Sequence, residues 1–193
     1  ALATDRVLDF DPGTLGHCTL ILADLTVKGG YATSITGTVP DGGGLRMAFG
    51  SSAPYADFVG IERVRFTDNR ASTNGAGALL LCPAQIRDSR FDHNSGALFG
   101  AGLAFYTDPT LSIEISGSTF DDNSSTQTGG GVLLQGSARI VNSTFSNNHA
   151  NFYGGGIYFS SPAGSLFVGS STIAYNTGAT NPNSVDSGAG LLV

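Results

Sequence analysis

Five residues whose side chains could do chemistry follow a recurring phenylalanine in the sequence. They stand one or two positions after Phe66, Phe91 or Phe120. Two carboxylates about 5 Å apart have the geometry of a retaining glycosidase. An imidazole between two carboxylates can transfer a proton or hold a metal ion. If the fold stacks these positions, the candidate catalytic residues are Asp68, Asp92, His93, Asp121 and Asp122.

The phenylalanine belongs to a phrase that repeats along the chain and ends in Asn. Each of its four central copies is followed by a Gly-x-Gly signature that ends eight residues after the Asn, and the repeat interval from Phe66 to Ile173 is 25–29 residues. Repetition at this period predicts a solenoid. Copies of the phrase occupy residues 26–30, 65–69, 90–94, 119–123, 144–148 and 172–176, with Gly in place of Asn in the first.

Three short stretches of every repeat alternate apolar and polar residues. Ile113 and Ile115 precede the phrase around Phe120, and Val132 and Leu134 follow its glycines. Alternation with a period of two is typical of β-strands, and no window shows the i, i+3, i+4, i+7 pattern of a helix. We therefore expect an all-β chain of about six coils, each with three short strands and no significant helix. Stacked coils place equivalent residues roughly 4.7–4.9 Å apart.

The repeated Asn is expected to form a ladder along the stack. Asn tolerates a left-handed backbone and bonds to neighbouring backbone at turns, and identical amides can bond from coil to coil. Turn chemistry also gives the acidic cluster a structural interpretation, because Asp and Asn are favoured at the same turn. The predicted ladder consists of Asn69, Asn94, Asn123, Asn148 and Asn176.

The phrase Ser-Thr-Phe-x-x-Asn at 118–123 and 143–148, with Gly-Gly-Gly-Ile at 154–157, resembles repeats of surface proteins. It looks like the right-handed parallel β-helix repeats of polymorphic outer-membrane-protein and adhesin type, from Leu20 to Val193. The resemblance implies a single-stranded right-handed parallel β-helix of the pectate-lyase-like superfamily and an extracellular or cell-surface location. The same fold serves adhesins, passenger domains, scaffolds, polysaccharide lyases and epimerases, so the fold does not select the function.

The outward positions of the third strand of each repeat are unusually apolar. Triplets such as 132–134 are therefore apolar on both faces, and such strands are normally covered on both. We expect an exposed strip that binds a protein partner or a second copy of the chain. The competing interpretation is that the insertions at 30–41 and 177–187 fold over it. The predicted interface residues are Leu79, Ala104, Leu133, Tyr158 and Leu192.

Length and composition limit the other function classes. The 193 residues are expected to form one domain, 1–193, with an irregular or partial first coil at 1–16. A formal net charge of −6 argues against nucleic-acid binding, and no apolar run is long enough to span a membrane. Because open solenoid ends expose unpaired strand edges, we expect a segment of a longer solenoid or a subunit of an assembly.

Three functions remain open. We favour a non-catalytic structural or adhesive β-helix that acts through assembly or partner binding on the third-strand face. The alternative is a carbohydrate-active enzyme, similar to polysaccharide lyases or epimerases, that uses the Asp/His column, although the loops beside this column have only eight residues. No cofactor and no metal ion is expected. The third function is ice binding by the column Thr26, Arg65, Arg90, Thr119, Thr144 and Thr172.

Overall fold

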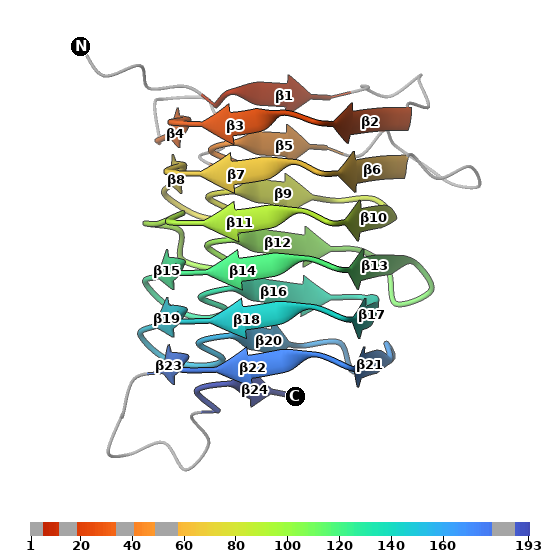
Figure 1. The fold of residues 1–193 in the computed structure, drawn as a ribbon, viewed down its shortest axis with the longest axis vertical. Coiled ribbons are helices and arrows are strands. Elements are labelled where there is room, and N and C mark those ends of the chain that lie inside the picture. Colours follow the sequence, from red (N-terminus) through yellow and green to blue (C-terminus); the bar gives the residue numbers. More distant parts are fainter. Residues whose placement is uncertain (1–5, 12–18, 34–40, 49–57, 179–187) are drawn as a thin grey trace.

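The structure is a computed structural model that describes residues 6–11, 19–33, 41–48, 58–178 and 188–193. These residues form a parallel β-solenoid in which successive turns stack along one axis (Figure 1). The described ranges contain strands and turns but no helix, and so none that could cross a membrane. The predicted all-β parallel solenoid is therefore confirmed.

Three sheets run along the stack, and each complete turn adds one strand to each of them (Figure 1). The first sheet has six strands: β2 (Thr19–Ala23), β6 (Phe58–Glu62), β10 (Ala84–Arg87), β13 (Ser112–Ser116), β17 (Ser137–Val141) and β21 (Leu166–Gly169). The second also has six: β3 (Thr26–Lys28), β7 (Arg65–Thr67), β11 (Arg90–Asp92), β14 (Thr119–Asp121), β18 (Thr144–Ser146) and β22 (Thr172–Ala174).

The third sheet has seven strands and contains the predicted interface positions. Its strands are β1 (Leu8–Phe10), β5 (Leu45–Met47), β9 (Ala78–Leu80), β12 (Leu103–Tyr106), β16 (Val132–Gln135), β20 (Ile157–Phe159) and β24 (Leu191–Leu192). Two small sheets lie at the turn after the second sheet (Figure 1). They are built from β4 (Tyr31–Ala32) with β8 (Arg70–Ala71), and from β15 (Ser124–Ser125), β19 (His149–Ala150) and β23 (Thr177–Gly178).

The phenylalanines of the repeated phrase form the centre of the core. Phe91 pairs in register with Phe66 on one side and with Phe120 on the other. Ring centroids of successive members are 4.7, 4.7 and 4.9 Å apart, the last between Phe120 and Phe145, and all four side chains are fully buried. The same residue type therefore occupies four successive turns, because the register places each ring on the next, with Val27 and Ile173 at the two ends of the column.

The turn between the second sheet and the ladder Asn has a left-handed backbone in every turn of the stack. Asp68, His93 and Asp122 have φ of 55°, 57° and 53° at this corner. Asp and Asn tolerate this conformation better than most residues because their short polar side chains bond locally. The backbone therefore accounts for three of the five candidate catalytic residues before any chemistry is invoked.

Candidate functional site

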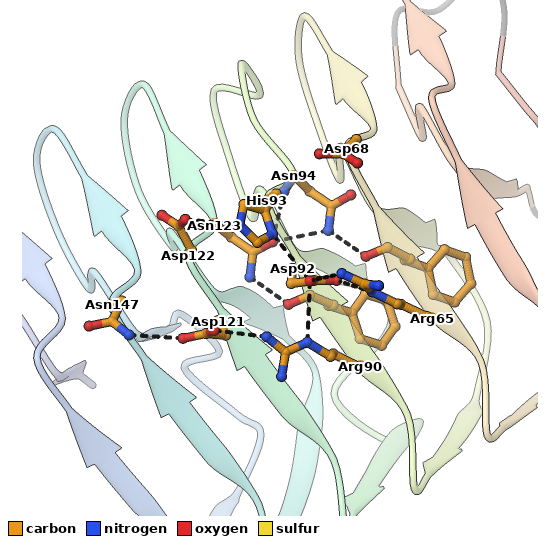
Figure 2. Close-up of polar contacts among 12 residues, drawn as sticks. Arg65, Asp68, Arg90, Asp92, His93, Asn94, Asp121, Asp122, Asn123 and Asn147 are labelled. Atoms are coloured by element: carbon orange, nitrogen blue, oxygen red, sulfur yellow. Dashed lines mark hydrogen bonds and ion pairs between the residues drawn. The ribbon is translucent and has the colours of Figure 1, made fainter.

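Asp92, on β11, is the centre of the polar cluster (Figure 2). Its side chain is fully buried. Arg65 on the neighbouring strand β7 donates hydrogen bonds to both carboxylate oxygens, from Nε to Oδ1 at 2.9 Å and from Nη2 to Oδ2 at 2.5 Å. Arg90 Nε and His93 Nδ1 contact Oδ2 at 3.2 and 3.1 Å. Burial alone would raise the pKa of Asp92, but hydrogen bonds from these three partners outweigh it and lower the pKa to about 2.

Asp121 repeats this arrangement one turn further along the stack. Arg90 Nη2 lies 2.9 Å from its Oδ2, so the Arg90 guanidinium bridges the two carboxylates (Figure 2). Ser146 Oγ and Asn147 Nδ2 donate to Asp121 Oδ1 at 2.7 and 3.0 Å. Burial raises the pKa of Asp121, while these two hydrogen bonds and the Arg90 charge lower it below the ordinary value. Asp92 and Asp121 are thus both held ionised.

His93 and Asp122 meet as predicted, but Asp68 does not join them (Figure 2). His93 Nε2 lies 3.3 Å from Asp122 Oδ2, while its Nδ1 contacts Asp92. Asp68 instead forms an exposed ion pair with Lys28, at 3.2 Å. The register does place His93 between Asp68 and Asp122 in the stack, but its side chain contacts only Asp122, while Asp68 pairs with Lys28 of the preceding turn.

Asp92 and Asp121 differ in protonation from the carboxylate pair of a retaining glycosidase, because the pKa of each is lowered. A retaining glycosidase needs one protonated acid and one ionised nucleophile, whereas here a guanidinium stands between two ionised carboxylates. Within the described residues, no group of three or more His, Cys, Asp or Glu side chains could hold a metal ion.

A shallow cavity of about 440 Å³ lies beside the cluster. It follows the corner between the first and second sheets over three turns. None of the five candidate catalytic residues lines it, so this hollow does not present a substrate to them. Its lining residues are Asp24, Leu25, Thr26, Arg63, Val64, Arg65, Asp88 and Arg90.

The apolar strip predicted on the third sheet is not exposed over most of its length. Leu79, Ala104 and Leu133 retain only 2%, 0% and 4% of their accessible surface, and Tyr158 and Leu192 are half-buried. The expectation that Leu79, Ala104 and Leu133 are exposed is therefore wrong. Both insertions that were considered as covers lie partly outside the described residues, at 34–40 and 179–187.

The glycine turn that precedes each third strand lies close to the outward position of that strand. A Cβ added to Gly129 would lie 3.0 Å from Leu133 Cβ, and one added to Gly154 would lie 2.7 Å from Tyr158 Cβ. These glycines have φ of 67° and 58°, so the chain reverses there and lies against the outward side chain four residues later. The eight-residue loop therefore ends close to the outward positions of the third strand.

The predicted Asn ladder is confirmed. The backbone N–H and Nδ2 of Asn94 both donate to Asn123 Oδ1, at 3.1 and 3.0 Å, and Nδ2 also donates to the Phe66 carbonyl at 3.0 Å. The same bonds join each member to the next as far as Asn176. All members before Asn176 are fully buried.

A second ladder, of serines, precedes the Phe position by two residues and was missed from the sequence. The N–H of Ser89 donates to Ser118 Oγ at 3.1 Å, and each hydroxyl donates to the carbonyl two residues before it. The available signal was the recurrence of Ser in four successive repeats at this position, which alternation alone interprets as an inward apolar position. The members of the Ser ladder are Ser89, Ser118, Ser143 and Ser171.

Comparison with known proteins agrees with this geometry. Residues 41–177, more than half of the chain, match the family described as a right-handed beta helix region. No curated protein and no solved structure matches the chain. The family match covers the Phe stack, the Asn ladder and the polar cluster alike. This chain therefore belongs to the right-handed β-helix family.

Proposed function

We propose that this chain is a non-catalytic structural β-helix that acts at an extracellular or cell-surface location by binding a protein partner. The observation that carries the proposal is the Arg65–Asp92–Arg90–Asp121 network, in which the carboxylates suited to catalysis join successive turns of the stack. A carboxylate held by two guanidiniums contributes to stability and has no proton to give at neutral pH. The location rests on the resemblance to adhesin-type repeats alone.

Exposed apolar side chains support contact with a partner near the ends of the stack. Large hydrophobic residues that are exposed occur in the described chain only up to Leu25 and from Phe152 onward. Near the C-terminal side, the Tyr153 ring contacts the rings of Phe152 and Tyr158, each at 6.4 Å between centroids. Tyr is enriched at the energetic centres of interfaces. Tyr158 and Leu192 are thus the part of the predicted strip that a partner could reach.

The second candidate function is a carbohydrate-active enzyme. One observation favours it: the His93 side chain keeps 48% of its surface and stands between Asp92 and Asp122. An exposed imidazole in such a position can accept a proton from a substrate. Ice binding gains no such support, because Arg65 and Arg90 interrupt the threonine column in register.

An assay for lyase activity separates the structural function from the enzyme. Wild-type protein, His93→Ala and Asp121→Asn would be incubated with uronate polysaccharides while the absorbance of 4,5-unsaturated product is followed. Asp68→Asn, outside the network, serves as the matched variant. We expect no product from any of the four proteins. Product that forms with wild type and Asp68→Asn but not with the other two folded variants would replace this proposal with the enzyme.

A further inference from the structure

The chain contains two Asn-x-Ser/Thr tripeptides, which are the acceptor pattern for N-linked sugars in secreted proteins. They occupy residues 123–125 (Asn-Ser-Ser) and 142–144 (Asn-Ser-Thr). As sequence patterns the two are equivalent. In the folded chain their Asn side chains lie in opposite environments, and this difference predicts which of them carries a sugar.

The side chain of Asn123 is fully occupied by the Asn ladder. Both hydrogens of its Nδ2 are donated, one to the Phe91 carbonyl and one to Asn148 Oδ1, each at 2.9 Å. Asn123 is fully buried, and the hydroxyl of Ser125, two residues later, is buried as well. A sugar on Nδ2 replaces one of the two hydrogens, so it would break a ladder bond and would have to fit inside the stack. A chain modified at Asn123 therefore cannot close the ladder.

Asn142 lies at the corner between β17 and β18 (Figure 1), where its backbone is left-handed with φ of 49°. Its N–H donates to the Gly169 carbonyl at 3.2 Å, which fixes the backbone to the next turn. Its side chain is exposed, and within the described residues neither hydrogen of its Nδ2 has an acceptor. The corner thus presents a free amide on an ordered backbone.

The turns on either side of Asn142 leave room for a sugar. Because turns stack only roughly 4.8 Å apart, a sugar on this amide must lie over its neighbours in the corner column. The register places Gly117 before Asn142 and Ser170 after it, and both are small. Asp88, one turn before Gly117, extends over that glycine and forms no hydrogen bond with Asn142.

Thr144 supplies the hydroxyl that the acceptor pattern requires two residues after the Asn. It is the first residue of β18, is partly exposed, and its hydroxyl forms no hydrogen bond with the described residues. Both parts of this tripeptide are therefore accessible, whereas both parts of the tripeptide at 123–125 are buried.

We propose that Asn142 accepts an N-linked oligosaccharide and that Asn123 does not. The inference rests on the extracellular or cell-surface location in the proposed function, since this modification belongs to secreted chains. The amide nitrogen of Asn142 attacks C1 of the first sugar of a lipid-linked oligosaccharide. A C1–N bond forms, and the C1–O bond to the lipid pyrophosphate breaks, with its electron pair leaving on the pyrophosphate. A base of the transferase takes up the amide proton that is lost.

The test secretes the full chain from a eukaryotic host that adds N-linked sugars. A secretion signal precedes Ala1, and an Asn-Ala-Thr tag follows Val193, so that sugar on the tag shows that the chain has met the transferase. The secreted protein is then treated with an amidase that removes the sugar and leaves Asp at the modified position. Mass spectrometry of its peptides assigns each modified Asn.

We expect sugar on the tag and on Asn142, and none on Asn123. Thr144→Val keeps the branched shape on β18 but removes the hydroxyl, so occupancy at Asn142 should fall at least about tenfold, whereas Thr144→Ser should retain it. Ser125→Ala destroys the other tripeptide and is the matched control, which should leave occupancy unchanged. Because the Asn142 amide has no bond to lose, removing the sugar should shift the melting temperature by less than about 2 °C.

Two results would overturn the inference. One is a secreted protein that carries sugar on its tag while Asn142 stays unmodified. The other is sugar on Asn123 in a protein that still melts cooperatively, since the buried ladder would then admit it. Neither result bears on the assay for lyase activity. Product from uronate polysaccharides, in turn, would replace the proposed function and leave a sugar on Asn142 in place.

Discussion

The Asn ladder and the column of Asp92 and Asp121 run side by side over the same turns. Both place identical polar side chains one strand spacing apart, but different interactions stabilise the two columns. In the Asn ladder, a neutral amide both donates and accepts, so identical residues can follow one another at strand spacing. In the acidic column, Asp92 and Asp121 can only accept, and two carboxylates at that spacing repel. Arg90 between them supplies the missing donors and charge. The ladder can therefore be extended by any number of turns, whereas the ionic network is local.

The largest effect is expected when a central rung of the ladder is removed. Asn123→Ala deletes an acceptor for two donors of Asn94 and two hydrogen bonds that the Asn123 amide donates, all of them buried. Because unsatisfied buried groups cost about 1–3 kcal/mol each, we expect the free energy of unfolding to fall by about 4 kcal/mol in urea denaturation. The same substitution at half-buried Asn176 is the control and should cost less than half as much. Equal losses would contradict the ladder as a buried network.

A smaller loss is expected when the ionic network is broken. Asp92→Asn keeps the shape of the side chain but removes the charge that holds Arg65 and Arg90. Both guanidiniums are about half exposed and can turn to water, so the loss should be about 2 kcal/mol rather than the 3–5 kcal/mol of a fully buried pair. A double-mutant cycle with Arg65→Gln measures the coupling by urea denaturation. A coupling free energy below about 0.5 kcal/mol would mean that the network stabilises the fold no more than an exposed ion pair does.

Acid should act on the network and leave the Asn ladder unaffected. The pKa of Asp92 is about 2 in the folded protein against an ordinary 3.8, so the unfolded chain takes up the proton first. The stability that this group contributes is present above the ordinary pKa and is lost as the pH falls through about 2. Melting temperatures from about pH 5 to pH 2 should therefore fall more steeply for wild type than for Asp92→Asn. Parallel curves would contradict the lowered pKa.

The sequence predicts which residues stack from turn to turn better than it predicts which outward side chains are buried. Spacing alone placed Asn69 to Asn176 and the phenylalanines in register, because one period of repetition fixes both. The expected exposure of Leu133 is wrong because alternation tells which way a side chain points and not what lies over it. The turn residue nearest to it, Gly129, carries no apolar signal. The register also places Asp68 in the column of His93 as expected, but its side chain pairs with Lys28, because the partner of a long side chain depends on its reach and not on column position.

The smallest change in the free energy of unfolding is expected at Asp68. Two substitutions there distinguish the contribution of the left-handed backbone from that of the charge. The pair with Lys28 is exposed on both sides, so its loss should cost at most about 0.5 kcal/mol. Asp68 also has φ of 55°, a conformation that Asn tolerates and Ala does not. We therefore expect Asp68→Asn to be nearly neutral and Asp68→Ala to lower the free energy of unfolding by about 1 kcal/mol. If the two variants instead lose stability equally, charge rather than the left-handed corner selects Asp at this position, and the corner would not explain His93 and Asp122 either.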